Sequence, residues 1–374
     1  MSHPDAVSLT KSLLGFDTVN PPGRERDCAR SIGAMLQDSG FQVEYYEYAD
    51  SRTSVVARAG GSAAKAPLCL TGHIDVVPLG SRKWSKDPFR GETDGDRLYG
   101  RGSSDMKAGI AAILLAAVNS KKLFPGTPGV VLVLTAAEEG GCIGSQHLAR
   151  TQLLGKAGAM IVGEPTSNYP YVGHKGSLKF HARFRGISAH GSMPELGENA
   201  IYKASKAALK LESFDFAVSP HPVMGKPTVN VGTFEGGQGV NMVPDVASIG
   251  VDIRTVAGMD HSLVLNNIKK LLGSDVEVDV FSDMNAVWTE PQHEWVQRVF
   301  EISGKHLGAR PQPRAQTYNT DAGNLLKVYK GVPAVVLGPG EAAQAHQTDE
   351  YCSMERIRQS VAIYEDLIRD WCRA

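Results

Sequence analysis

The 374-residue sequence is poor in cysteine and in aromatic side chains, has no long apolar run and carries almost no net charge. Its five cysteines are scattered without a Cys-x-x-Cys spacing, which argues against a disulfide framework. The longest apolar run, Gly109–Val118, is far shorter than the ~18 residues that a membrane-spanning helix needs. Lys and Arg total 39 against 40 Asp and Glu, with no local basic tract, so neither nucleic acid nor a membrane is an expected partner.

What is present is the composition of a globular protein, with 42% hydrophobic and 21% charged residues. The length favours two domains, or one large domain with an insertion. Residues 1–5 lack the basic and apolar regions of a signal peptide. We therefore expect a soluble, cytoplasmic protein of mixed α/β structure.

The first half of the chain alternates short apolar runs with helical patterns. Buried strands are expected at Ser54–Arg58, Pro67–Thr71, Val130–Thr135 and Ala159–Gly163. Helices are expected at Met106–Ser120 and Gly144–Leu154. This alternation predicts a largely parallel, doubly wound sheet with helices on both faces.

The pattern changes after Lys175, where Ser177–Arg185 alternates apolar and polar residues in the manner of a half-exposed strand. Elements then follow in the order β-α-β-β-α-β, which is the ferredoxin-like arrangement. The pattern of the first half, with apolar strands between helices, then resumes. It predicts a helix at Glu294–Leu307, a strand at Ala334–Leu337 and a helix at Met354–Cys372. The chain is thus predicted to hold a catalytic domain, 1–175 and 288–374, split by an inserted α+β domain, 176–287.

Acids and histidines follow the ends of the predicted sheet strands, where ligands bind in open α/β sheets. They are His73 and Asp75, Glu138 and Glu139, Glu164, and His346, with Asp105 after a glycine-rich loop. Each alone has an ordinary explanation, such as a helix N-cap for Asp105 or a solvated strand end for the glutamates. Taken together, two histidines and three carboxylates suit Zn²⁺. A pair of metal ions needs one histidine and one carboxylate for each ion, a carboxylate that bridges them, and a base for the shared water. Asp75 is placed to orient the ring of His73.

These motifs, taken in order, identify a resemblance to the dinuclear zinc amidohydrolase and exopeptidase family that includes acetylornithine deacetylase, succinyl-diaminopimelate desuccinylase, aminoacylase and the glutamate carboxypeptidases. The resemblance spans nearly the whole chain. It is carried by Thr71–Pro78, Gly100–Lys107, Glu138-Glu139, Gly163–Thr166, Ser188–Ser192, Asn241–Pro244, Asp252–Arg254 and Gly338–Tyr351. It implies a zinc-exopeptidase-like catalytic domain in which the ferredoxin-like insertion serves as lid and dimerisation domain.

The resemblance also implies roles for individual residues. His73 and Glu164 would hold one Zn²⁺ and Glu139 and His346 the other, with Asp105 bridging them; Co²⁺ or Mn²⁺ suit the same ligands. Glu138 resembles the family's general base, which takes a proton from the attacking water and passes it to the leaving amine.

Residues of the insertion resemble the family's substrate-binding groups. His190 resembles an oxyanion donor that reaches the active site of the partner subunit, which implies a homodimer. Arg254 and Asn241 match positions that grip the α-carboxylate of the substrate. Thr320 lies where the family has a small polar residue near the oxyanion, although helix N-capping explains it equally well. Surface positions remain the ordinary alternative for His190 and Arg254.

The expected reaction is metal-dependent hydrolysis of the amide of an N-acyl-L-amino acid. Within that class the segments Gln344–Tyr351 and Gly163–Thr166 look most like acetylornithine deacetylases, and His174–Gly176 points the same way. Succinyl-diaminopimelate desuccinylase is the nearest alternative, followed by another aminoacylase or a dipeptidase. A non-catalytic relative is disfavoured because every ligand position and Glu138 are filled, and a dinuclear phosphoesterase would need more cations near the metals.

Overall fold

The computed structural model describes residues 5–61 and 64–373. Residues 1–4, on which most of the expectation about a signal peptide rests, lie outside the described residues. The chain divides into two compact units. The first comprises the described residues up to Gly173, Trp288–Arg314 and those from Thr320 onward; the second comprises His174–Val287 and Ala315–Asn319.

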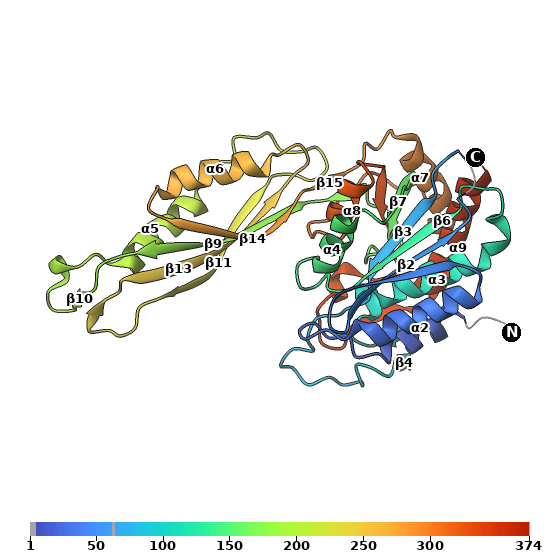
Figure 1. Cartoon of the computed structure of the whole chain (residues 1–374), viewed down its shortest axis with the longest axis horizontal. Helices are drawn as coiled ribbons and strands as arrows, with labels where there is room; N and C mark the ends of the chain where they lie inside the picture. The colour runs from blue at the N-terminus through green and yellow to red at the C-terminus, as the bar shows by residue number, and fades with distance from the viewer. Residues whose placement is uncertain (1–4, 62–63, 374) are drawn as a thin grey trace. The chain divides into compact units, whose positions relative to one another are not determined.

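The first unit is built on a six-stranded sheet in the order β1-β2-β6-β3-β7-β16 (Figure 1). Its strands are β1 (Gln42–Ala49), β2 (Arg52–Ala59), β3 (Leu68–His73), β6 (Val130–Thr135), β7 (Ala159–Val162) and β16 (Ala334–Val336). Strands β6, β3, β7 and β16 run parallel. Strand β2 is antiparallel to β6, and β1 extends it as a hairpin, so the predicted largely parallel sheet has an antiparallel margin.

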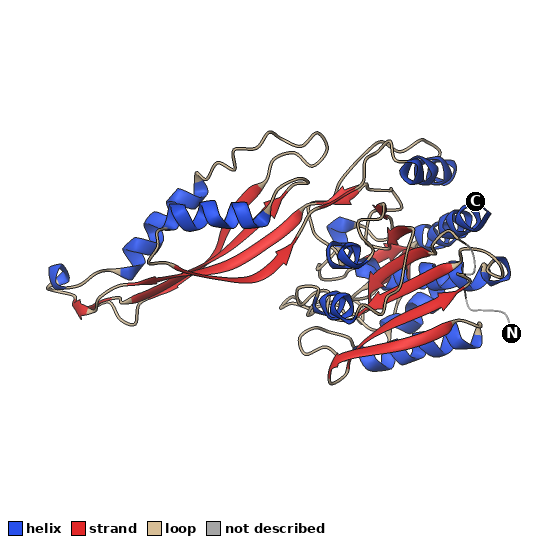
Figure 2. Ribbon diagram, turned by 45° about the horizontal axis from the view of Figure 1, so that its top comes forward, coloured by secondary structure: helices blue, strands red, loops and turns tan. Residues whose placement is uncertain are grey.

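Helices lie on both faces of this sheet, as the doubly wound prediction requires (Figure 2). They are α1 (Ala6–Leu14), α2 (Glu25–Asp38), α3 (Ala108–Asn119), α4 (Ile143–Thr151), α7 (Glu294–Leu307), α8 (Ala322–Val328) and α9 (Met354–Arg373). Helix α3 is apolar almost all round, because it packs between the sheet on one side and α1 and α9 on the other. The sheet and helices enclose one large core in which β3 and β6 are buried at every position.

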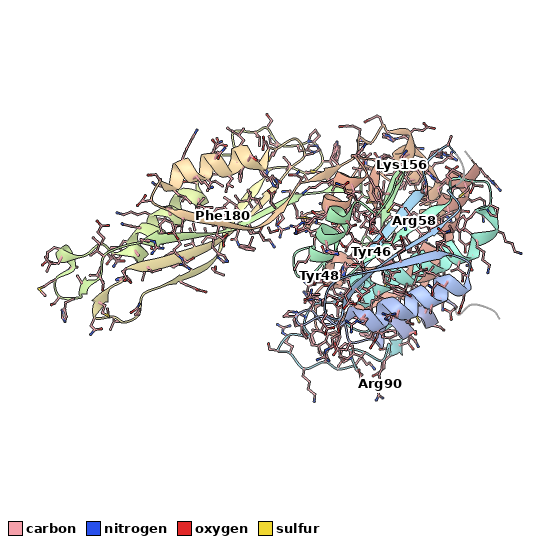
Figure 3. All side chains as sticks on the ribbon, viewed as in Figure 1. Tyr46, Tyr48, Arg58, Arg90, Lys156 and Phe180 are labelled. Atoms are coloured by element: carbon pink, nitrogen blue, oxygen red, sulfur yellow. The ribbon has the colours of Figure 1, made fainter. Side chains whose placement is uncertain are left out.

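The second unit contains a four-stranded antiparallel sheet in the order β11-β13-β9-β14. Its elements are β9 (Gly176–Arg185), α5 (Ala200–Glu212), β11 (Thr228–Gly236), β13 (Val246–Thr255), α6 (His261–Leu272) and β14 (Glu277–Met284). Helices α5 and α6 cover one face of the sheet (Figure 2). The fully buried Phe180, labelled in Figure 3, belongs to the core that the sheet and these helices form. The β-α-β-β-α-β order is the predicted ferredoxin-like one.

Short strands and turns complete the described structure. The strands are β4 (Thr93–Asp94), β5 (Arg97–Tyr99), β8 (Gly173–His174), β10 (Ala189–His190), β12 (Met242–Val243), β15 (Val287–Trp288) and β17 (Tyr351–Ser353). Single helical turns occur at η1 (Ser103–Lys107), η2 (Lys121–Leu123), η3 (Pro194–Leu196) and η4 (Ala342–Gln344). No helix among the described residues is long and apolar enough to cross a membrane.

One short segment joins the second unit from outside the predicted insertion. Ala315–Asn319 follows the first unit in sequence but belongs to the second. The amide of Lys175 donates to the carbonyl oxygen of Gln316 at 2.9 Å, and Arg254 Nη1 donates to Asn319 Oδ1 at 3.3 Å. These long-range hydrogen bonds could not be inferred from the local pattern of residues 315–319.

Candidate metal centre

Four parallel strands of the first unit deliver the predicted acids and histidines to one edge of the sheet. His73 is the last residue of β3 and pairs with Thr135, the last residue of β6. Glu138 and Glu139 follow β6, Glu164 follows β7, and the segment after β16 leads to His346. Parallel neighbours end at the same edge, so side chains far apart in sequence meet there.

Asp105 lies between the two histidines. Its Oδ1 is 3.1 Å from Nε2 of His73, and its Oδ2 is 3.5 Å from Nε2 of His346. Its backbone is extended, with φ −122° and ψ 91°, so it interrupts the helical turn that carries it. The helix was expected to begin at Met106, but α3 begins at Ala108. The carboxylate therefore does not cap a helix but turns one oxygen to each histidine.

Two further glutamates complete a set of groups around each histidine. Oε1 of Glu164 is 3.7 Å from His73 Nε2, and Oε2 of Glu139 is 3.2 Å from His346 Nε2. Potential ligand atoms of His73, Asp105 and Glu139 all lie within 4.8 Å of one another. The shortest contacts divide these residues into two half-sites of one histidine and one glutamate each, with the two oxygens of Asp105 shared between them. Glu139 also comes within 4.8 Å of His73, so the two half-sites adjoin.

The donor atoms suit divalent metal ions. Imidazole nitrogens with carboxylate oxygens are borderline-soft and hard ligands, which fits Zn²⁺, Co²⁺ and Mn²⁺. Oε1 of Glu139 is buried and makes no hydrogen bond, so it keeps a lone pair for an ion. The cluster also gathers more buried carboxyl groups than histidines, and cations would balance their charge. The residues present therefore fit a pair of metals.

The pKa values of the clustered groups follow from this crowding of charges. Hydrogen bonds to Asp105 and Glu139 raise the pKa of His346 to about 10 despite the opposing effect of burial. For Asp105, burial is the largest influence and raises the pKa, but the two histidines outweigh it and hold the pKa below its ordinary value. Burial raises the pKa of Glu164 well above its ordinary value. At neutral pH His346 therefore holds a proton that a metal ion would have to displace.

Asp75 does more than the sequence indicated. His73 Nδ1 lies 2.9 Å from the main-chain oxygen of Asp75 but 3.6 Å from its carboxylate. The carboxylate instead accepts the main-chain amide of Glu138 at 3.0 Å and that of Glu139 at 3.1 Å, together with Asn20 Nδ2 at 2.8 Å. Asp75 orients the ring through its backbone and holds the glutamate pair through its side chain.

Glu138 lies in a half-buried position near the candidate ligands His73 and Glu139, whose charges act on it. Cys142 Sγ donates to its Oε1 at 3.2 Å. Burial raises the pKa of Glu138 well above its ordinary value; His73 opposes this shift, whereas the neighbouring carboxyl of Asp321 reinforces it. A raised pKa brings a carboxyl group closer to neutral pH, which suits a group that first takes up a proton and then donates it.

Thr320 and Asp321 come from the start of α8. Thr320 is fully buried, and its Oγ1 accepts the amide of Ala322 at 3.2 Å, whereas the N-cap position of α8 is Asp321. Asp321 makes no capping hydrogen bond; its Oδ2 accepts the hydroxyl of Thr135 at the end of β6. This hydrogen bond holds Asp321 near Glu138, close enough for its charge to affect the pKa of Glu138. The local sequence around Asp321 gives no sign of this proximity.

The predicted residues of the second unit fall into two separate places. His190 on β10 pairs with Met242, and the amide of Gly191 donates to the oxygen of Asn241 at 2.7 Å, so His190 and Asn241 are neighbours. Both are exposed. Arg254 lies eight residues beyond Val246 along β13, about 27 Å at the usual rise of an extended strand. Arg254 and Asn241 of one chain therefore cannot hold the same small carboxylate.

Arg254 has its own surroundings. Its Nη2 donates to Asp252 Oδ2 at 3.0 Å, and Nη1 contacts Asn319 as described above. Lys175 is a second cation near it: burial, and then the charge of Arg254, lowers the pKa of Lys175. The sequence motif contained Lys175, but only the strand pairing places it beside Arg254.

Two supporting residues were not anticipated from the sequence. Asn20 contacts Asp75, 55 positions away in the chain. Glu350 is fully buried and binds the loop that carries Asp105. Glu350 follows His346 within a motif that had been noted, but its partners come from residues about 245 positions earlier.

The chain is similar over most of its length to known proteins. Residues 69–370 match peptidase family M20/M25/M40. The chain is 32% identical over 357 residues to an acetylornithine deacetylase of Myxococcus xanthus, covering 91% of this chain and 90% of that one. It is 28% identical over 401 residues to a probable succinyl-diaminopimelate desuccinylase of Staphylococcus epidermidis, covering 99% and 98%.

Solved structures show the same fold. An M20 family metallo-carboxypeptidase from Sulfolobus solfataricus superimposes with a TM-score of 0.83 at 19% identity, covering 99% of both chains. A Bacillus subtilis protein described as a dinuclear metal binding peptidase from the M20 family gives a TM-score of 0.73 at 15% identity, covering 98% of both. Since the family match covers most of the sequence, the chain belongs to peptidase family M20/M25/M40 and is a hydrolase of that family.

Proposed function

We propose that this protein hydrolyses the amide bond of N-acyl-L-amino acids, with N-acetyl-L-ornithine as substrate and L-ornithine and acetate as products. The observation that carries the proposal is the position of Asp105, whose two oxygens face two histidines, each with its own glutamate. The relatives named acetylornithine deacetylase, of which one is 32% identical, support the choice of substrate.

Two Zn²⁺ ions, replaceable by Co²⁺ or Mn²⁺, are the proposed cofactors. His73 and Glu164 would hold one ion, Glu139 and His346 the other, and Asp105 both. When bound, the ions supply Lewis-acid activation of water and of the scissile carbonyl group.

Glu138 is the proposed general base. It takes a proton from the attacking water and delivers it to the nitrogen of the leaving amine, so that its carboxylate is restored at the end of each turnover. Its raised pKa suits the protonated half of that cycle. Asp75 positions Glu138 and Glu139 through their amides and orients His73 through its main-chain oxygen.

The second unit is proposed to bind substrate and to dimerise. Arg254 would hold the α-carboxylate of its own chain's substrate, while His190 and Asn241 would act on the substrate of the partner subunit, with His190 donating to the oxyanion. The separation of Arg254 from Asn241 along β13 supports this division. Exposed apolar side chains of the second unit, including Tyr202 and Leu209 on α5 and Phe234 on the edge strand β11, support a homodimer. Thr320 is proposed to lie near the oxyanion.

A cytoplasmic location completes the proposal. All five cysteines are buried thiols, as suits a reducing compartment.

The test is release of free amine by the zinc- or cobalt-loaded protein. N-acetyl-L-ornithine, N-succinyl-L,L-diaminopimelate, N-acetylmethionine and a simple dipeptide are compared at equal concentration, with a loaded Glu138→Ala protein as control. We expect the highest kcat/KM for N-acetyl-L-ornithine. Failure to turn over any of the four, with metal bound, would exclude the deacylase function.

A second candidate is succinyl-diaminopimelate desuccinylase. A succinyl group and an amino acid together carry carboxylates at both ends, which need more than one cation. Lys175 beside Arg254 supplies a second one, and the relative from Staphylococcus epidermidis carries this name. A higher kcat/KM for N-succinyl-L,L-diaminopimelate than for N-acetyl-L-ornithine in the same panel would favour the desuccinylase function over the deacetylase function.

A further inference from the structure

Glu350 is a buried carboxylate whose four hydrogen bonds all come from one loop. Its Oε1 accepts the main-chain amides of Ser104 at 2.7 Å and Asp105 at 3.0 Å. Its Oε2 accepts the amide of Gly102 at 3.0 Å and Nη1 of Arg101 at 2.6 Å. Glu350 is 0% exposed, so these donors replace water completely.

The loop that these donors belong to ends at the group between the two half-sites. Gly102 has φ +87°, a conformation that favours glycine, and Asp105 departs from helical geometry within the turn. Such a backbone has no regular hydrogen-bond ladder of its own. Glu350 supplies acceptors for three of its amides, including the amide of Asp105 itself.

The same residue is tied to the segment that carries His346. His346 has φ +65°, which costs free energy for a residue with a side chain and persists only where the surroundings impose it. Arg101 Nη1 also donates to the oxygen of Gln347 at 3.1 Å, and the amide of Gly100 donates to the oxygen of Glu350 at 2.9 Å. The Asp105 loop and the His346 segment are thus joined through Glu350.

We infer that Glu350 is a positioning residue of the metal centre, which sets the distance between Asp105 and His346 and thereby the affinity of the half-site formed by His346 and Glu139. The inference rests on the dinuclear site of the proposed function. His73 and Glu164 depend less on Glu350, because His73 is the last residue of β3 and Glu164 follows β7, and both strands belong to the central sheet. The two half-sites should therefore respond unequally when Glu350 is changed.

The alternative is that Glu350 only stabilises the fold through its buried ion pair with Arg101. Removing one partner of such a pair is strongly destabilising wherever it lies. That role predicts a lower Tm but leaves the two metal affinities in their wild-type ratio. The stepwise affinities therefore separate the two roles.

The experiment uses full-length protein stripped of metal with a chelator and titrated with Co²⁺, followed by calorimetry and by visible absorption. Wild type is expected to bind two equivalents. Glu350→Gln replaces an acceptor oxygen by a donor amide facing N–H groups. It is expected to retain the first Co²⁺ and to bind the second about 10- to 100-fold more weakly, the usual range for residues that support metal ligands.

The matched control is Glu341→Gln. Glu341 is nearby in sequence, but its side chain pairs with Arg356 rather than with the metal-site loop. It should bind two equivalents as wild type does. If Glu350→Gln does not fold, Glu350→Asp keeps the charge but is too short to reach all four donors, and the same weakening of the second step is expected.

Equal affinity ratios in wild type and in the folded Glu350 variant would overturn the inference while leaving the proposed function intact. Wild-type protein that binds no Co²⁺ would overturn both.

Discussion

The carboxylate of Asp75 accepts the main-chain amide of Glu138 at 3.0 Å, although 63 residues separate the two in sequence. The other oxygen of Asp75 accepts the amide of Glu139. One fully buried side chain thus places both the proposed base and a proposed ligand. The end of β3 and the turn after β6 are thereby fixed to each other.

Asp75→Asn should impair catalysis and metal binding together. The three groups that donate hydrogen bonds to its carboxylate are N–H groups, so the new amide nitrogen opposes one of them. We expect metal affinity to fall by about 10- to 100-fold, with a loss of kcat. Asn20→Ala, which removes one of the three donors and keeps the carboxylate, is the control and should have a smaller effect. Equal losses in both variants would contradict this role for Asp75.

Glu138→Ala should retain its metals and lose turnover. The side chain is not among the proposed ligands, and loss of a general base typically costs about 10²- to 10⁴-fold in rate. Metal content by elemental analysis and amine release would be measured on the same preparation. Glu301→Ala, on the exposed side of α7, serves as control. Activity that survives Glu138→Ala would show the base to be another group.

His346→Ala and Asp105→Ala should differ in metal stoichiometry. Asp105 faces both histidines, whereas His346 belongs to one half-site. Equilibrium dialysis with Zn²⁺ should therefore give about one ion for His346→Ala and a loss at both positions for Asp105→Ala. The same stoichiometry in the two variants would be inconsistent with a bridging Asp105.

Metal binding should release protons at neutral pH. The pKa of His346 is raised to about 10 in the metal-free protein, so its imidazole is protonated at pH 7 and must lose that proton to bind an ion. Apparent metal affinity should accordingly rise with pH until it passes this pKa. Calorimetry at pH 7 in two buffers of different ionisation heat would measure the release. Observed heats that are independent of the buffer would contradict it.

A mixture of Glu138→Ala and His190→Ala proteins should regain activity. If His190 acts across the dimer, a mixed dimer contains one site with both Glu138 and His190 intact. Random exchange makes half of the dimers mixed, which gives about a quarter of wild-type activity. Each variant alone is the control. No recovery after confirmed subunit exchange would place His190 outside the partner's site.

The sequence by itself was sufficient for the fold class and for the gathering of the candidate ligands. Apolar runs the length of strands, separated by helical patterns, can bury themselves only as a sheet covered on both faces. Residues that follow the ends of parallel strands then have to meet at one edge, which predicts that His73 and Glu164 lie close together. Their assignment to the same metal ion came only from the family resemblance.

Tertiary structure alone decided what supports those groups and which of them lie together. Glu350 and Asn20 hold loops that are distant in sequence, and their own local patterns are those of ordinary polar residues. The antiparallel direction of β2 is likewise known only from its pairing with β6. The separation of Arg254 from Asn241 is known only from how β13 pairs with β9. Periodicity reports which face of an element is buried, but hydrogen bonds between distant segments depend on where the completed fold brings them.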